Sequence, residues 1–155
     1  MSPPYRLLAL VLAALSLCAL PASAAEPRKV DGQRKSPREA TAQNRIVIQI
    51  NEDDVKKWNA TLASIRNIQA ELGAKNTQIA VVAISYGLGM LTADSLAATG
   101  VQDALATGVE FVACGNSMKA QNVVQDDLID GVGIAKAGYV ELMKRQQQGW
   151  AYLRP

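Results

Sequence analysis

The sequence contains no histidine. Histidine is the side chain that most readily exchanges a proton near neutral pH, and it supplies the base in Ser-His-Asp triads and Cys-His pairs. It is also a common zinc ligand. The absence of histidine therefore excludes hydrolases built on these triads or pairs, and it excludes zinc sites with histidine ligands.

Cysteine is almost absent as well, because the chain has only Cys18 and Cys114. Cys18 lies in an N-terminal segment that has the pattern of a signal peptide. Arg6 supplies positive charge, residues 7–20 form an apolar run, and a small-residue cleavage signal ends at Ala24. The apolar run has about 14 residues, whereas a membrane-spanning helix needs roughly 20.

We therefore predict that residues 1–24 are a cleaved signal peptide, that the mature protein is periplasmic or secreted, and that processing leaves no stable membrane span. Cys114 would then be the only cysteine, which excludes an intramolecular disulfide and a multi-cysteine metal cage within one chain. Asp126, Asp127 and Asp130 do not have the spacing of a calcium loop. We expect no metal site and no organic cofactor.

Residues 25–44 are predicted to be a flexible basic leader, because this stretch is rich in lysine and arginine, contains Pro27, Gly32 and Pro37, and has almost no large apolar residue. From Ile46 onward, basic and acidic residues nearly balance. This balance argues against a nucleic-acid-binding surface, which would require clustered positive charge.

Residues 45–155 alternate between strand and helix patterns. We expect strands at 45–50, 77–85, 110–113, 132–135 and 150–153. We expect helices from Asn51, as N-cap, to Gly73, over 91–105 with an interruption near Gly100, over 115–120 and over 138–148, and a loop with a helical turn at 123–129. The alternation predicts one α/β domain with a mostly parallel five-stranded sheet.

Ligands and chemistry collect at the carboxyl ends of the strands in such sheets. The loop after Ser85 carries Tyr86-Gly87-Leu88-Gly89, which is neither a complete dinucleotide fingerprint nor a P-loop. We interpret this loop as a close-packing turn, with Tyr86 beside a pocket.

The loop after Ala113 begins with Cys114, between a strand end and a predicted helix start. Backbone N–H groups and the helix dipole stabilise a thiolate there, and Gly115, Asn116 and Ser117 allow close approach and offer further donors. A reactive thiol is one interpretation. The other is an inert thiol that packs as a small hydrophobic group.

The motif Gly-Val-x-Phe-x-x-Cys-Gly-Asn-Ser/Thr-Met/Leu occurs here from Gly108 to Met118. A helix starting at Gly138 and the tail Gln148 to Pro155 follow it. Together these features resemble the DsrE-like (DsrE/DsrF-like) family, in particular its exported members of uncharacterised function.

The resemblance spans roughly residues 45–155 and implies a three-layer α/β/α domain and homo-oligomers, often trimers or hexamers. Family members in sulfur relays carry sulfur as a persulfide on a cysteine after the third strand, and Cys114 occupies that place. Relatives often have Pro-Ser-Gly before the last helix, whereas this chain has Lys136-Ala137-Gly138.

Two functions follow as expectations. The first is a sulfur-carrier or thiol-exchange protein that acts through Cys114 with a sulfur donor or acceptor protein as partner. The second is an oligomeric module that binds a small ligand or assembles without chemistry, with Cys114 buried and inert.

Overall fold

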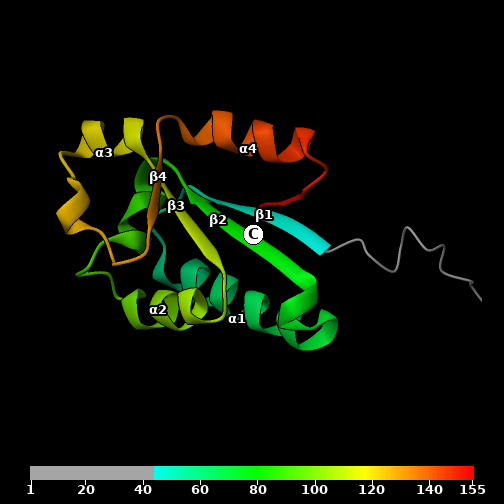
Figure 1. Cartoon of the computed structure of the whole chain (residues 1–155). Coiled ribbons are helices and arrows are strands. Elements are labelled where there is room, and N and C mark those ends of the chain that lie inside the picture. The colour runs from blue at the N-terminus through cyan, green and yellow to red at the C-terminus, as the bar shows by residue number, and fades with distance from the viewer. Residues whose placement is uncertain (1–43) are drawn as a thin grey trace, which may run out of the picture. The chain divides into compact units, whose positions relative to one another are not determined.

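The computed structural model describes residues 44–155 as an α/β fold. The predicted signal peptide, with Cys18, and the basic leader up to residue 43 lie outside the described residues. Five strands form one sheet in the order β4-β3-β2-β1-β5, and every neighbouring pair is parallel (Figure 1). Their bounds are β1 Asn44–Ile50, β2 Thr77–Ala83, β3 Glu110–Cys114, β4 Gly133–Ala135 and β5 Ala151–Leu153.

Four α-helices connect the strands, and they are α1 Val55–Leu72, α2 Ala98–Ala106, α3 Gly115–Gln121 and α4 Gly138–Gln147. Short 3-10 helices lie at η1 Ala74–Asn76, η2 Ser85–Leu91 and η3 Gln125–Asp127. Figure 1 shows α1 and α2 on one side of the sheet and α4 on the other. The expected three-layer arrangement with a parallel five-stranded sheet is therefore confirmed. No helix within residues 44–155 has the length and apolarity to cross a membrane.

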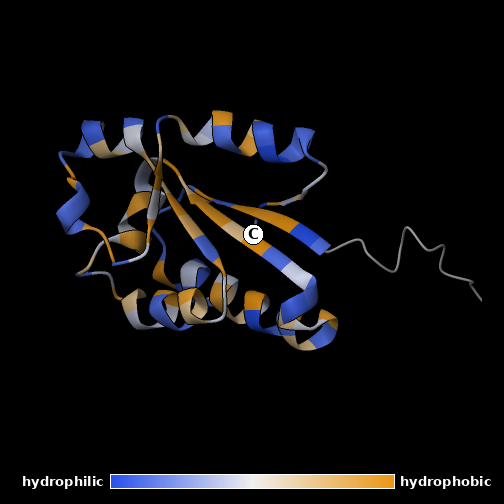
Figure 2. Ribbon diagram, in the orientation of Figure 1, coloured by the Kyte–Doolittle hydropathy of each residue, from blue (hydrophilic) through white to orange (hydrophobic). Residues whose placement is uncertain are grey.

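The two faces of the sheet bury different side chains because successive residues of a strand point to opposite faces. In β1, Ile46, Ile48 and Ile50 belong to the large apolar cluster beneath α1 and α2. Val47, on the opposite face, packs in a smaller cluster with Leu142 of α4. Figure 2 shows the central strands largely apolar, as expected for a sheet covered on both faces.

The predicted strands differ from the observed ones by a few residues at their ends, but two helices required larger corrections. Asn51 was expected to cap α1, yet Asp54 is the N-cap, and its carboxylate accepts the Lys56 and Lys57 N–H groups at 2.9 and 3.1 Å. The acidic residues 52–54 therefore precede the first turn. The capping carboxylate is better placed than the amide because it accepts both otherwise unpaired N–H groups.

The helix expected over residues 91–105 is the second correction. Leu91 ends η2, residues 93–97 form turns after the bridge residue Thr92, and α2 begins at Ala98 and continues through Gly100. The turn at Thr92 pairs with Leu128 in an isolated antiparallel bridge. Tertiary pairing therefore overrides the helical pattern of this segment, and Gly100 is tolerated because its missing side chain leaves room for Leu62.

The segment Tyr86 to Gly89 is a close-packing turn, as predicted. A Cβ atom on Gly87 would lie 2.5 Å from the Ile50 carbonyl oxygen and 2.6 Å from its carbonyl carbon. The Ile84 N–H also donates to the Ile50 oxygen at 2.8 Å. The loop after β2 is therefore held against the end of β1 by backbone contacts that leave no space for a side chain.

Replacing Gly87 with alanine is expected to lower the free energy of unfolding by about 1–3 kcal/mol, because the new methyl group would overlap immobile backbone atoms. Urea denaturation of the two proteins measures the difference. Gly133→Ala is the matched control, since its Cβ would lie 3.6 Å from the Phe111 oxygen, an ordinary contact. Equal loss of stability in both variants would contradict the packing argument.

Candidate functional site

Cys114 lies at the carboxyl edge of the sheet, where three connections meet. It is the last residue of β3, and α3 begins at the next residue. Cys114 is also in register with Ala135, the last residue of β4. The chain leaves β4 through Lys136 and Ala137 and enters α4 at Gly138. The pairing of β3 with β4 thus brings the first residue of α4 to the thiol.

Gly138 contacts the thiol directly. Its N–H group donates a hydrogen bond to the Cys114 Sγ at 3.2 Å, and both residues are buried. A Cβ atom at this position would lie 2.7 Å from Ile84 Cγ1 and 3.1 Å from Cys114 Cβ. Glycine therefore allows the start of α4 to come close enough for its backbone to reach the sulfur.

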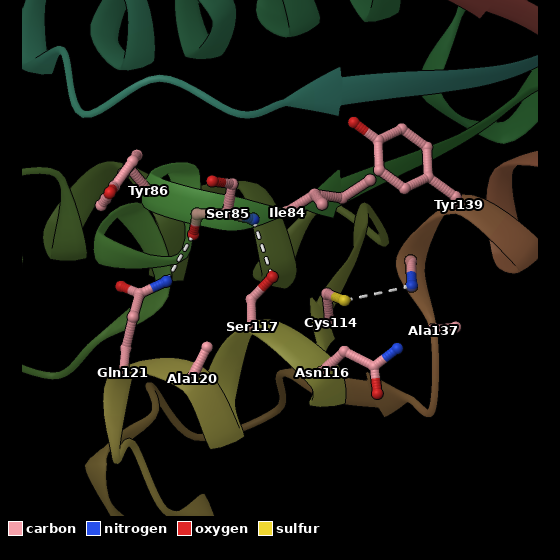
Figure 3. A pocket seen from close by; sticks show the side chains of 11 residues that line it. Ile84, Ser85, Tyr86, Cys114, Asn116, Ser117, Ala120, Gln121, Ala137 and Tyr139 are labelled. Carbon is pink, nitrogen blue, oxygen red and sulfur yellow. Dashed lines mark hydrogen bonds between the residues drawn. The ribbon is translucent and has the colours of Figure 1, made fainter.

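Cys114 lines a pocket of about 510 Å³ at this edge of the sheet. The lining residues come from the segment after β2, the end of β3, the length of α3 and the start of α4 (Figure 3); they are Ile84, Ser85, Tyr86, Cys114, Asn116, Ser117, Ala120, Gln121, Ala137, Gly138 and Tyr139. Cys114 is only 4% exposed, whereas Tyr86 and Tyr139 are 69% and 65% exposed. The thiol is therefore recessed among buried side chains, and two aromatic rings stand near it in solvent.

A hydrogen-bonded group fixes one wall of this pocket. The Ser85 N–H donates to Ser117 Oγ at 2.7 Å, and Gln121 Nε2 donates to the Ser85 carbonyl oxygen at 2.8 Å (Figure 3). Ser85 has φ +53°, a conformation that non-glycine residues rarely adopt. Because the Ser117 oxygen accepts the hydrogen bond from Ser85, its own O–H remains available to donate another.

Burial and the neighbouring hydrogen-bond donors act on the pKa of Cys114 in opposite directions. Burial by itself raises the pKa of the Cys114 thiol. Hydrogen bonds from the Ser117 side chain and from the backbone N–H groups of Gly138, Ser117 and Asn116 act in the opposite direction and outweigh burial. The pKa of Cys114 therefore lies below that of an ordinary cysteine, which favours the nucleophilic thiolate.

Comparison with known proteins identifies the family. A sequence model of the DsrE/DsrF-like family matches residues 59–155, more than half of the chain. The chain belongs to the DsrE/DsrF-like family. Among curated proteins no match was found.

Solved structures of similar fold agree with this membership. A protein of unknown function from Methanobacterium thermoautotrophicum is 37% identical, with a TM-score of 0.69 over 72% of this chain and 98% of the other. A conserved protein of unknown function from Bacteroides thetaiotaomicron is 16% identical, with a TM-score of 0.62 over 74% and 97%. The ychN protein from E. coli is 18% identical, with a TM-score of 0.59 over 72% and 99%. The last two show the fold alone.

In this DsrE/DsrF-like domain, the predicted site residues Cys114, Asn116, Ser117 and Tyr86 all line one pocket. Gly115 does not line it. A Cβ atom on Gly115 would lie 3.3 Å from the Ala135 oxygen and 3.4 Å from the Lys136 oxygen, so this glycine allows α3 to pack against the β4–α4 turn.

Three further residues contribute to the site and were not predicted from the sequence: Ser85, Gln121 and Gly138. Gly138 was predicted to start a helix after the short strand 132–135, but its contact with Cys114 depends on the order of the strands, which the sequence does not show. Ser85 and Gln121 are far apart in the sequence, and no sequence pattern predicts that they meet. Their contact depends on the unusual backbone conformation of Ser85.

Acidic residues 126, 127 and 130 do not form part of this site. Asp127 instead accepts the Val124 N–H at 2.9 Å and closes the turn that contains η3. Within the described part of the chain, no group of three acidic, cysteine or histidine side chains is arranged to hold a metal ion. The polar chemistry of the pocket therefore comes from the thiol, hydroxyls, amides and backbone N–H groups.

Ser117→Ala is expected to raise the pKa of Cys114, because the variant loses a hydroxyl that stabilises the thiolate. Below the ordinary pKa of a thiol, less thiolate will be present, and alkylation by iodoacetamide should slow severalfold near neutral pH. The rate at high pH, where the thiol is fully ionised, should change little. The pH dependence of the second-order rate constant measures this shift.

Gln121→Ala is the control for this experiment. It removes the bond to the Ser85 carbonyl oxygen and leaves the Ser117 hydroxyl in place. An equal pH shift in both variants would show that the effect arises from the Ser85 loop and not from the hydroxyl.

Proposed function

We propose that this protein is an exported sulfur carrier or thiol-exchange protein that acts through Cys114. The observation that carries the proposal is the hydrogen bond from Gly138 N–H to the sulfur, at 3.2 Å, on a thiol that lines a pocket. A structural cysteine needs neither a donor aimed at its sulfur nor access to a cavity. Membership of a family that in general relates to sulfur relay supports the same function.

The reaction begins with the Cys114 thiolate, which attacks the sulfane sulfur of a donor. A new S–S bond forms, the donor's bond to that sulfur breaks, and the leaving group takes the electron pair. With a sulfane-sulfur donor, Cys114 then holds one extra sulfur atom as a persulfide. With a disulfide donor, it holds one half of the donor as a mixed disulfide. An acceptor thiolate attacks the outer sulfur in the second step and restores the Cys114 thiolate.

The surrounding residues can perform this chemistry without a separate base. The lowered pKa already favours the thiolate, so no histidine is required to remove its proton. The Gly138 N–H and the Ser117 hydroxyl stabilise negative charge on the sulfur when it attacks and when it leaves. The recessed position limits access to small donors or to an extended acceptor group.

The second candidate is a binding or assembly module in which Cys114 is silent. The observation that favours it is the 4% exposure of Cys114, which is typical of a packed thiol. This function predicts that thiol reagents fail to modify Cys114 until the protein unfolds. The two candidates are therefore separated by the accessibility of one sulfur atom.

Cys114→Ser is expected to abolish sulfur uptake, because serine has no comparable nucleophile at neutral pH. The exported form, purified without reductant, is treated with inorganic polysulfide, and its intact mass is recorded before and after reduction. The wild type should gain sulfur that reduction removes, and the variant should gain none. The same spectra locate the N-terminus and so test the cleavage after Ala24.

A wild-type protein that gains no sulfur and resists alkylation while folded would contradict the carrier function and favour the binding module. Uptake that persists in Cys114→Ser would also contradict it. Circular dichroism of both proteins shows that the comparison is between folded chains.

We further propose that the protein forms homo-oligomers through the outer face of α4. Tyr139, Val140 and Met143 are large apolar side chains of this helix and are 44–65% exposed. Contiguous apolar side chains on a soluble protein commonly mark an interaction surface. A second copy of the chain is the partner that the family resemblance indicates.

Met143→Glu is expected to weaken association about tenfold or more, since burying an unpaired carboxylate costs more than about 1.4 kcal/mol. Light scattering at several protein concentrations measures the change in mass. Gln147→Glu places the same charge one turn further along α4 at an already polar, exposed position. A monomeric wild type, or a Met143→Glu variant of unchanged mass, would contradict the proposed interface.

A further inference from the structure

A second pocket of about 450 Å³ lies beside the Cys114 pocket. It is lined by Asn116, Ala135, Lys136, Ala137, Val140, Glu141 and Lys144. Asn116 and Ala137 line both pockets, so the two hollows adjoin each other on either side of these residues. Figure 3 shows both residues next to Cys114. The second pocket is therefore adjacent to the pocket that Cys114 lines.

The charge of the second pocket is positive. Lys136 and Lys144 have no carboxylate within ion-pair distance among residues 44–155. Glu141 also lines the pocket, but its carboxylate accepts the Arg145 Nε–H at 2.7 Å. Arg145 also pairs with Glu110 at 2.7 Å, so a single guanidinium is shared between two carboxylates. Two lysines against one ion-paired carboxylate leave the lining of this pocket with a net positive charge.

We propose that this second pocket binds the anionic end of a small sulfane-sulfur donor and places its sulfane sulfur at Cys114. The inference rests on the proposed carrier function and specifies its substrate class. Thiosulfate is the simplest such donor, and glutathione persulfide, whose carboxylates supply the charge, is a larger one. The lysine ammonium groups and the Asn116 amide are the groups that would bind the anionic oxygens.

With thiosulfate, the Cys114 thiolate attacks the outer sulfur. The new bond joins this sulfur to Cys114 Sγ, the S–S bond of thiosulfate breaks, and sulfite leaves with the electron pair. The thiolate and thiosulfate together carry three negative charges, and the persulfide anion and sulfite carry the same three. No proton, oxidant or reductant is needed.

The lysines address the main obstacle to this step, which is repulsion between two anions. A thiolate and a dianion in contact repel strongly unless cations lie next to them. Lys136 and Lys144 can offset this repulsion during the approach and stabilise the sulfite that leaves. An uncharged donor does not meet this repulsion and does not require the lysines.

The experiment measures the initial rate of Cys114 modification in the full mature chain by intact mass, with thiosulfate, glutathione persulfide and uncharged dimethyl trisulfide as separate donors. Dimethyl trisulfide forms a mixed disulfide and releases methyl persulfide. The variants are Lys136→Gln, Lys144→Gln and the double substitution. Lys119→Gln is the control, because Lys119 is an exposed lysine of α3 that lines neither pocket.

Each single substitution is expected to slow the reaction with the anionic donors about three- to fivefold, and the double substitution about tenfold, as for partly exposed charge interactions. The rate with dimethyl trisulfide and all rates of Lys119→Gln should stay within about twofold of the wild type, since neither change alters charge at the pocket. Slowing with thiosulfate but not glutathione persulfide, or the reverse, identifies which source of anion the pocket accepts.

Two negative outcomes are distinguishable. A wild type that reacts with dimethyl trisulfide but not with either anion, or that loses no rate in the double variant, overturns the substrate class and leaves the carrier function standing. A folded wild type that reacts with none of the three donors overturns the carrier function and this inference with it.

Discussion

The contact between Gly138 and Cys114 is the constraint on which the site depends. β3 and β4 must end side by side, so that the short turn after Ala135 can return the chain over the thiol. The N–H group of Gly138 then reaches the sulfur only because residue 138 is a glycine. Any side chain at this position would overlap the side chain of Ile84. This one contact therefore has two effects. It lets α4 pack closely on the sheet, and it stabilises negative charge on the sulfur.

Most of the fold could be predicted because its signals are local. The run Arg45 to Ile50 is apolar and β-branched, and Gly73 ends the first helix with φ +82°, a conformation that suits glycine. The errors occurred where local signals compete or where distant segments decide. Asn51 has a side chain that suits a cap, but Asp54, three residues later, is the residue whose carboxylate accepts the free N–H groups of α1. Thr92 pairs with Leu128, a contact that no short-range pattern contains.

The candidate site could be predicted only in part. The position of Cys114 between a strand and a helix is visible in the sequence, and so are the donors that follow it in α3. The donor from α4 depends on strand order, because β4 must lie next to β3 and not elsewhere in the sheet. The charge of the neighbouring pocket depends on which carboxylates are already paired, and the ion pairs of Arg145 with Glu141 and Glu110 appear only in three dimensions.

Both edges of the sheet are formed by three-residue strands, β4 and β5. A strand of this length offers few unpaired backbone groups to an incoming chain, and short edges are one way in which proteins avoid open-ended strand addition. Continuous sheets running from one molecule to the next, as in fibrils, are therefore disfavoured by the architecture itself. Contacts through helices and loops do not extend a sheet in this way, because side chains and not open backbone groups form them.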